Sequence, residues 1–183
     1  MSTRLRDLAF LNAGIQISVI DERESGKERS FHYEGGISSF VEHLSKKKNP
    51  LHEDVISIAD ERDEVRIEVA LCWNDSFQEN IFCYTNAIYN RDGGTHLTGL
   101  RSALTRTLNH WGTENKLIKD NQSSLSGEDV REGLVAVIAV KHPDPSFNNQ
   151  PKEKLINNEV KGIVEGIVNE HLGRYLEHNP RVA

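Results

Sequence analysis

Two side chains that could bind an anion stand close together late in the sequence, Gln150 and Lys152. The lysine ammonium attracts an anionic oxygen as a point charge, and the glutamine amide can donate a hydrogen bond to the same oxygen. Pro143 and Pro145 lie just before them, and because proline has no N–H to give to a sheet, this segment must be a loop. A lysine in a loop can equally be a solvated surface charge, so the residues alone leave both interpretations open.

The loop follows an uninterrupted apolar run from Leu134 to Val140. A run of this length is typical of a strand that is covered on both faces. We therefore expect the core of the protein to pass through this strand, and we expect the strand to brace the Gln150–Lys152 loop.

The chain lacks the sequence patterns of a self-sufficient enzyme. It has neither of the glycine-rich motifs that cradle nucleotide phosphates, no HExxH zinc motif and no serine-nucleophile elbow. Cys72 and Cys83 have no paired spacing, which favours reduced thiols in strands over a disulfide or a metal site. We expect the chain alone to catalyse no reaction and to bind no metal or cofactor.

Length and charge narrow the class of protein. A chain of 183 residues is long enough for one well-packed domain, and it has no apolar run that could span a membrane, so we expect a cytoplasmic protein without a membrane partner. The net charge of −6 argues against a surface that binds nucleic acid throughout. The segment from Gly93 to Thr113, however, contains Arg101 and Arg106 and no acidic residue, so any DNA contact is expected there.

Apolar spacing predicts a helix, a hairpin and a second helix at the start of the chain. These are a helix from Arg4 to Phe10, a half-buried strand from Gly14 to Asp21, a turn from Arg23 to Lys27, a partner strand from Glu28 to Glu34 and a helix opening after Gly35-Gly36.

Three strands are predicted next, in the arrangement of a mostly antiparallel meander. The strand from Val55 to Ala59 is expected to be buried on more than one side. Alternating apolar residues predict a long strand from Val65 to Trp73 with one buried face. The apolar run from Ile81 to Ile88 predicts a single further strand.

A helix with Thr95 as its N-cap should follow, because leucines and a tryptophan then recur at helical spacing. The apolar stripe comprises Leu97, Leu100, Leu104, Leu108 and Trp111. Arg101 lies about 100° from Leu100 around the helix axis and can therefore leave the stripe for the surface. On an amphipathic helix, a solvated arginine is the alternative to a ligand contact.

The rest of the chain is predicted to contain a polar loop from Glu114 to Ser124 and two more helices. The first is short and begins with a capping box of Ser126 and Asp129. The second is long, because apolar residues recur at helical spacing from Val160 to Leu176, and it should run to about Asn179-Pro180.

Strings spread along nearly the whole chain resemble the transducer domain of the B subunit of bacterial DNA gyrase. They are His32–Gly36, Trp73–Asp75, Phe77–Asn80, Asp92–His96, Thr105–Asn109, Arg131–Lys141, Pro143–Pro145, Phe147, Gln150, Lys152, Lys154-Leu155 and Glu159–Lys161. They occur in order and without large gaps.

The resemblance implies an α+β fold like domain 2 of ribosomal protein S5, with a mostly antiparallel sheet covered by helices and a long C-terminal helix. Residues 1–10 would be a lead-in helix from an absent ATPase domain, and residues 11–183 would form a single transducer domain. The chain would then be a fragment of a larger protein, preceded by a GHKL ATPase domain and followed by a TOPRIM domain. Its further partners would be the A subunit of DNA gyrase and double-stranded DNA.

The resemblance also implies roles for the candidate residues. Lys152, with Gln150 beside it, would contact the γ-phosphate of ATP held by the neighbouring domain, while ATP and Mg²⁺ would be used by the full-length subunit only. Arg101 and Arg106 would face the cavity that receives a DNA duplex. The family loop usually reads Gln-Thr-Lys, and Pro151 here removes the hydroxyl and the N–H of the middle residue, while Gln150 and Lys152 are kept, so the charge contact can persist.

Three alternatives remain at this point. The B subunit of topoisomerase IV shares the architecture, although the His32–Gly36 and Phe77–Asn80 strings are more gyrase-like. A stand-alone RNA-binding module of the S5 type belongs to another class, and the acidic net charge argues against it. The third is an interaction domain whose loop binds no nucleotide.

Overall fold

The structure is a computed structural model that describes residues 2–23, 26–118 and 124–183. The helices are α1 (Ser2–Leu11), α2 (Ile37–Ser45), α3 (Thr95–Glu114), α4 (Gly127–Arg131) and α5 (Asn158–His178). The strands are β1 (Gln16–Asp21), β2 (Lys27–His32), β3 (Ile56–Arg62), β4 (Val65–Trp73), β5 (Asn80–Thr85), β6 (Ile88–Tyr89) and β7 (Leu134–Lys141). Among the described helices, none has both the length and the apolar character needed to cross a membrane.

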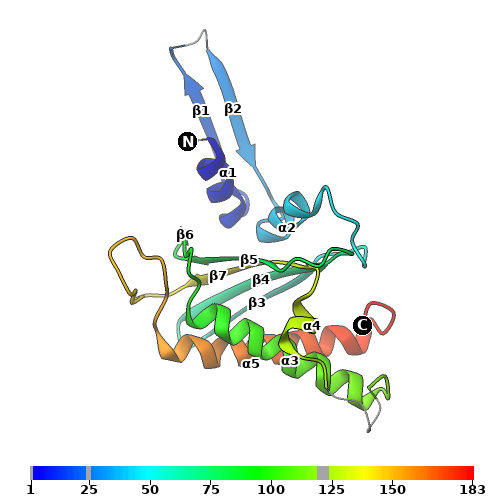
Figure 1. The fold of residues 1–183 in the computed structure, drawn as a ribbon. Coiled ribbons are helices and arrows are strands. Elements are labelled where there is room, and N and C mark those ends of the chain that lie inside the picture. The colour runs from blue at the N-terminus through cyan, green and yellow to red at the C-terminus, as the bar shows by residue number, and fades with distance from the viewer. Residues whose placement is uncertain (1, 24–25, 119–123) are drawn as a thin grey trace.

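A five-stranded sheet lies between two layers of helices (Figure 1). Helices α3 and α5 cover one face, and α1 and α2 lie on the other. The hairpin of β1 and β2 extends away from the sheet on the α1 side. The predicted N-terminal helix, the half-buried strand with its partner and the helix after Gly36 are all confirmed, while part of the predicted turn, residues 24–25, lies outside the described residues.

Strand β7 forms the centre of the sheet, as its apolar run predicts. Every residue from Leu134 to Val140 is buried. The side chains alternate between two cores: Leu134, Ala136, Ile138 and Val140 pack with α3 and α5, whereas Val135, Val137 and Ala139 pack with α1 and α2. Both faces of β7 are covered from Leu134 to Val140, which accounts for the absence of polar residues in that run.

The predicted meander is wrong, because the strand order is β3-β4-β7-β5-β6. Strand β7, which comes last in sequence, inserts between β4 and β5 and runs parallel to β5. A parallel pair needs a crossover, and α3 and α4 supply it between β6 and β7. The fold is therefore mixed α+β with one parallel pair in an otherwise antiparallel sheet.

Three individual strands also differ from the prediction. In β4, all residues from Val69 to Cys72 are buried, because both faces of this part of the strand are covered. In β3 only Ile56 and Ile58 are buried, while Ser57 and Ala59 are exposed, because β3 is an edge strand with one covered face. The single strand predicted from Ile81 to Ile88 is split into β5 and β6. Asn86 and Ala87 adopt positive φ angles of 49° and 63° and make the turn between them.

The helix predictions hold except for one cap. Leu100, Leu104 and Trp111 of the α3 stripe are buried, and α5 ends before Asn179 as predicted. The N-cap of α3 is Gly94 with φ 141°, not Thr95, because Gly94 makes a close backbone contact that a side chain would prevent. Residues 119–123 of the predicted polar loop after α3 lie outside the described part of the chain.

The capping box of α4 is confirmed: the Ser126 hydroxyl accepts a bond from the Asp129 N–H, and the Asp129 carboxylate accepts one from the Ser126 N–H.

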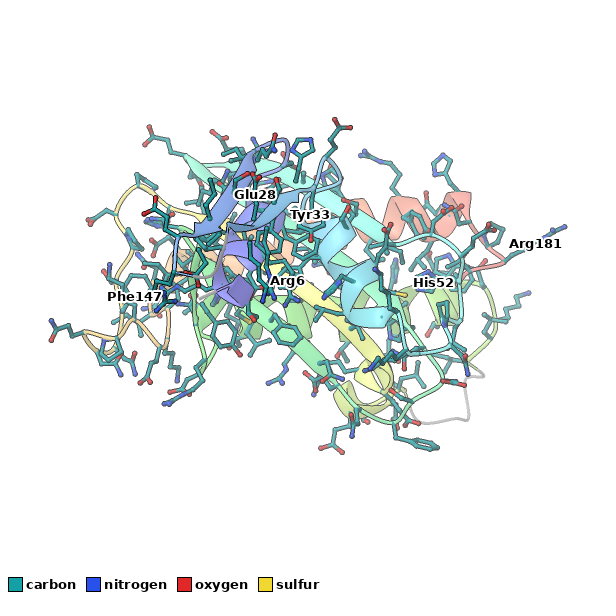
Figure 2. The ribbon with its side chains drawn as sticks, turned by 90° about the horizontal axis from the view of Figure 1, so that it is seen from above. Arg6, Glu28, Tyr33, His52, Phe147 and Arg181 are labelled. Carbon is teal, nitrogen blue, oxygen red and sulfur yellow. The ribbon has the colours of Figure 1, made fainter. Side chains whose placement is uncertain are left out.

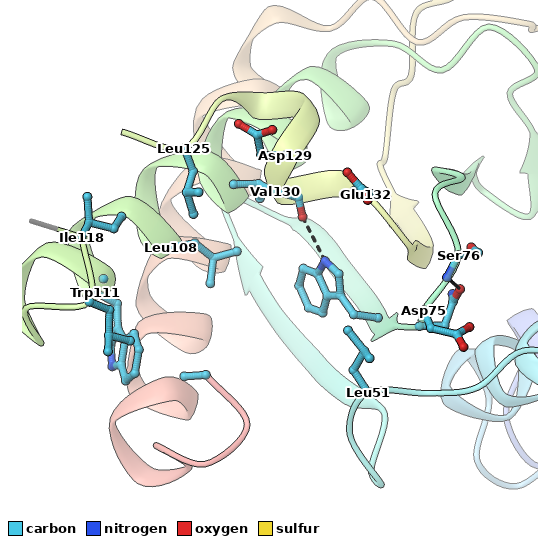
Figure 3. Close-up of a pocket in the computed structure, with 15 residues that line it drawn as sticks. Leu51, Asp75, Ser76, Leu108, Trp111, Ile118, Leu125, Asp129, Val130 and Glu132 are labelled. Carbon is cyan, nitrogen blue, oxygen red and sulfur yellow. Dashed lines mark hydrogen bonds between the residues drawn. The ribbon is translucent and has the colours of Figure 1, made fainter. Parts of the chain in front are cut away.

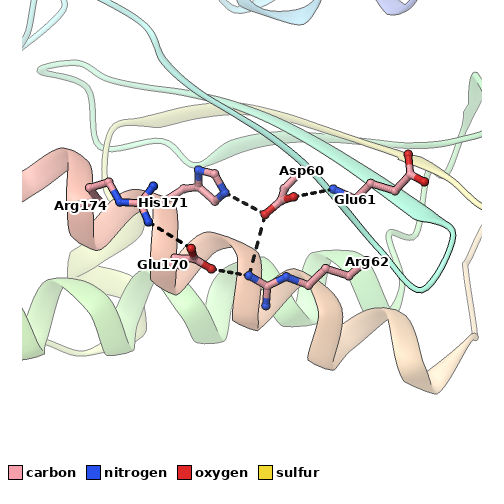
Figure 4. Close-up of polar contacts among 6 residues, drawn as sticks. All are labelled: Asp60, Glu61, Arg62, Glu170, His171 and Arg174. Carbon is pink, nitrogen blue, oxygen red and sulfur yellow. Dashed lines mark hydrogen bonds and ion pairs between the residues drawn. The ribbon is translucent and has the colours of Figure 1, made fainter.

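A polar cluster fixes α5 to the edge strand β3 (Figure 4). His171 Nε2 lies 2.9 Å from Asp60 Oδ2, and this bond holds the pKa of the Asp60 carboxyl below its usual value. Arg62 pairs with Glu170, which also accepts a hydrogen bond of 3.1 Å from Arg174. The C-terminal half of α5 is thereby attached to the side of the sheet farthest from β6.

Candidate functional site: an anchored loop between β7 and α5

The segment from 142 to 157 leaves β7 as a loop that projects beyond the end of the sheet (Figure 1). Its two limbs pair through Asn148 N to Lys154 O at 3.1 Å and Ile156 N to Ser146 O at 2.9 Å. Figure 2 shows Phe147 of this loop at the opposite end of the molecule from Arg181. The loop is therefore an ordered projection at one end of the domain.

Gln150 and Lys152 are both exposed at the tip of this loop, as predicted. The Lys152 ammonium lies 5.7 Å from the centroid of the Phe147 ring. The Lys152 backbone has φ 59°, a left-handed conformation that costs a non-glycine residue about 1–3 kcal/mol and persists only where the surroundings enforce it.

Those surroundings are the residues just before α3. Asp92 N donates to Glu153 O at 2.9 Å, Leu155 N to Gly93 O at 3.0 Å, and Thr95 N to Leu155 O at 3.0 Å. Leu155 is fully buried, so the returning limb of the loop is fastened to the core at the start of α3.

A buried polar cluster formed by Thr85, Asn90 and His96 reaches Lys152 from inside the protein. The Asn90 side-chain amide donates to Lys152 O at 2.7 Å. Its oxygen accepts a bond of 2.7 Å from the Thr85 hydroxyl and lies 3.1 Å from His96 Nε2. Burial lowers the pKa of His96 to about 4, so the imidazole is neutral at pH 7 and can donate its Nε2–H to Asn90.

The roles of Asn90 and its two partners are not predicted by the sequence. Their contacts join residues from β5, the segment after β6, α3 and the loop, and no local pattern predicts such a meeting. The sequence does show an asparagine directly before the turn segment Arg91–Gly94. Asparagine side chains next to turns often hydrogen-bond to nearby backbone groups.

Pro151, between the two candidate residues, faces helix α1. It contributes to a cavity of about 620 Å³ that is also lined by α1 and by Phe82, Tyr84 and Tyr89 of β5 and β6. The middle position of the loop is thus apolar in character and has no N–H to donate.

Arg101 and Arg106 lie on α3, but acidic side chains from other elements accompany both of them. Arg101 donates to Glu79 Oε1 through Nε at 2.9 Å and Nη2 at 2.6 Å, and Arg131 also donates to Glu79. Arg106 Nη2 lies 3.9 Å from Glu165 Oε2. The segment from Gly93 to Thr113 thus contains no acidic residue, but acidic side chains from other elements lie beside both of its arginines.

A second cavity, of about 560 Å³, lies between the end of α3, α4 and β4 (Figure 3). Its walls include Leu108, Trp111 and Trp73, whose indole N–H donates to Val130 O at 2.9 Å. Asp129 at its border is already engaged in the capping box of α4. The exposed loop tip therefore remains the better candidate for an anion.

The described residues contain no cluster of three or more His, Cys, Asp or Glu side chains that could hold a metal ion. Cys72 and Cys83 are free and buried in β4 and β5, which confirms the predicted thiols. Burial raises the pKa of Cys83 to about 12, so this thiol stays protonated at pH 7.

Comparisons with known proteins agree with the resemblance at the family level. Over all of this chain, the DNA gyrase B subunit of Bacillus mycoides is 45% identical and that of Myxococcus xanthus is 51% identical, and the chain covers 45% and 22% of those proteins. The 43K ATPase domain of Thermus thermophilus gyrase B, solved with an aminocoumarin, superposes with a TM-score of 0.90 at 38% identity. The topoisomerase IV ATP binding domain of Francisella tularensis gives 0.84 at 26% identity.

The chain spans less than half the length of each of these proteins, including 48% of the Thermus chain, although 99% of its own residues are matched there. The family model described as DNA gyrase B matches residues 36–183, which is most of the chain. This chain therefore belongs to the DNA gyrase B family.

Proposed function

We propose that this chain is the transducer domain of a gyrase B subunit, with residues 1–10 as the lead-in helix and residues 11–183 as one S5-like domain. It couples ATP binding and hydrolysis in a neighbouring GHKL domain to clamp closure and strand passage during DNA supercoiling. The observation that carries the proposal is an exposed ammonium and amide at the tip of a firmly anchored loop, in a chain with no phosphate-binding motif of its own.

The solved relative supports a division of labour between two domains. This chain covers 48% of the Thermus ATPase-domain chain, so about half of that chain is left for a separate nucleotide-binding unit. In the full-length protein, ATP and Mg²⁺ belong to the GHKL domain, and a TOPRIM domain and the A subunit of gyrase carry out the DNA cleavage that this chain controls.

Lys152 acts in this proposal as a sensor of the γ-phosphate, with Gln150 beside it. A unit charge pair at about 4 Å is worth about 4 kcal/mol at an effective dielectric constant near 20. This attraction exists while the γ-phosphate is present and is lost when the phosphate leaves. The loop therefore favours one interdomain angle with ATP and another after hydrolysis.

Arg101 and Arg106 are proposed to face the DNA duplex from α3. The side chain of Arg101 is 43% exposed and is held in a fixed direction by Glu79, and a DNA phosphate can compete with that carboxylate for the same guanidinium. Such contacts carry no sequence information, as suits an enzyme that acts on many sequences.

The coupling is tested by measuring ATP turnover of the full-length subunit with and without DNA in the Arg101→Gln variant. We expect DNA-stimulated turnover to fall by about threefold or more at physiological salt, while basal turnover stays within about twofold, because basal turnover needs no contact with DNA phosphate. Arg174→Gln, on α5, is the matched control and should change neither rate. An equal loss of both rates in Arg101→Gln would contradict the proposed role of Arg101.

The B subunit of topoisomerase IV is the second candidate, favoured by the structural likeness to the Francisella protein. The sequence relatives named above are gyrase B subunits, which favours gyrase. Supercoiling of relaxed plasmid by the reconstituted enzyme supports gyrase, and decatenation without supercoiling supports topoisomerase IV. The RNA-binding alternative is disfavoured because helices cover both faces of the five-stranded sheet, which leaves it no open stacking platform.

A further inference from the structure

We propose that Asn90 is a positioning residue for Lys152, and that through Asn90 a movement of Lys152 passes directly to the first turn of α3. The inference rests on the proposed role of Lys152 in sensing a phosphate. Asn90 is a buried residue outside the loop, and α3 is the first element that would respond to a movement of Lys152.

Asn90 is built into the core more firmly than the loop it holds. The residue is 1% exposed, its backbone N–H donates to Cys83 O at 2.8 Å, and its carbonyl accepts from Gly93 N at 3.0 Å. Its amide oxygen faces Thr85 and His96, which fixes the direction in which the amide nitrogen points. That nitrogen meets the Lys152 carbonyl at 2.7 Å.

The bond falls on the one residue of the loop whose backbone is strained. Lys152 is the loop residue with a positive φ angle, and Asn90 donates its hydrogen bond to the backbone carbonyl of this same residue. A left-handed lysine persists only when its surroundings determine it, and a hydrogen bond from a buried amide does so. The direction in which the ammonium leaves the loop thus depends on Asn90.

The same contacts connect the loop to α3. Gly94 and Leu155 pair as in a parallel bridge, and the N–H of Thr95, the first residue of α3, donates to Leu155 O. Asn90 and Arg101 also line one small cavity of about 300 Å³. A displacement of Lys152 therefore reaches the helix that carries Arg101 without passing through β7 or α5.

The C-terminal half of α5 is held in place by contacts with the sheet. The C-terminal half of α5 is fixed to β3 by Asp60 and His171 at the far edge of the sheet (Figure 4). A shift of α5 as a whole is therefore resisted at its C-terminal half, whereas the start of α3 is bonded directly to the loop and moves with it.

The test compares Asn90→Asp, Lys152→Ala and the double variant in the full-length protein. Aspartate keeps the size and the acceptor oxygen that Thr85 and His96 use, but in its ionised form it cannot donate to the Lys152 carbonyl. If Asn90 acts through Lys152, Asn90→Asp lowers kcat for ATP by about tenfold with little change in KM, and it adds nothing to the loss already caused by Lys152→Ala. A merely structural role predicts that the two losses multiply, and that result would overturn the proposal.

Hydrogen exchange gives a readout that needs no nucleotide. Asn90→Asp should speed exchange at the amides of Thr95 and Leu155 by about tenfold and leave the amides of α5 unchanged. Unchanged exchange at Thr95 and Leu155 would also refute the anchoring role. If Lys152→Ala alone does not alter ATP turnover, the proposed function fails, and the exchange rates still decide whether Asn90 holds the loop.

Discussion

Replacing Lys152 by alanine in the full-length protein should abolish ATP-driven supercoiling, with a loss of about a hundredfold or more. The reason is that the variant removes the charge that contacts the terminal phosphate in the proposed mechanism. Because the side chain is exposed, the free energy of unfolding should change by no more than about 0.5 kcal/mol. The measurement is the initial rate of supercoiling of relaxed plasmid by the variant, reconstituted with the A subunit of gyrase.

Lys154→Ala is the matched control for this experiment. Lys154 is also exposed on the same loop, and its backbone bonds to Asn148 are unaffected by the substitution. Its supercoiling rate should stay within about twofold of the parent, since an exposed charge without a direct phosphate contact is largely screened by salt. If both variants supercoil at the parent rate, Lys152 has no part in the mechanism.

Gly94→Ala should strongly destabilise the protein, by about 3–5 kcal/mol. A Cβ at Gly94 would lie 2.3 Å from the Leu155 carbonyl oxygen and 2.6 Å from its nitrogen. The φ of 141° is also unfavourable for any L side chain. Relief requires separating the loop limb from α3, which exposes a buried leucine. The measurement is the midpoint of urea unfolding.

Gly162→Ala is the control for adding a methyl group elsewhere. Gly162 is exposed in α5, and a Cβ there meets nothing within 4 Å. Alanine should therefore raise stability by about 0.5–1 kcal/mol through its better helix propensity. A Gly94→Ala variant that unfolds at the same urea concentration as the parent would show that the contact between Gly94 and Leu155 is not required.

The elements of the fold follow from local patterns in the sequence. The run from Leu134 to Val140 predicts the central strand because only a doubly covered strand can bury every residue. The leucine stripe of α3 and the Ser126 capping box are likewise set by residues within one or two turns of each other. These features depend on neighbours in the chain, so the sequence contains them directly.

The arrangement of those elements depends on contacts between distant parts of the chain. The parallel pairing of β7 with β5 joins segments more than fifty residues apart, and no periodicity encodes it. The turn at Asn86 and Ala87 lacks the glycine that usually marks a positive φ, so the apolar run through it looks like one strand. Chain order alone therefore suggested a meander.

The candidate site shows the same limit. The loop and its two exposed residues could be predicted, because prolines end the strand and polar residues follow. Two sets of contacts could not be predicted: Glu79 accepts hydrogen bonds from both Arg101 and Arg131, and Asn90 donates to the Lys152 carbonyl. Both depend on the folded arrangement of several elements. Local patterns predict which groups are available, and tertiary packing decides which of them meet.

The most direct test of the phosphate sensor is a crystal structure of the full-length protein in complex with a non-hydrolysable ATP analogue. We predict that the Lys152 ammonium leaves the Phe147 ring and lies within about 3 Å of a γ-phosphate oxygen, with the Asn90 bond to the Lys152 carbonyl retained. An ammonium that points into bulk solvent, or that still lies over Phe147 while the analogue is bound, would contradict the proposed role of Lys152.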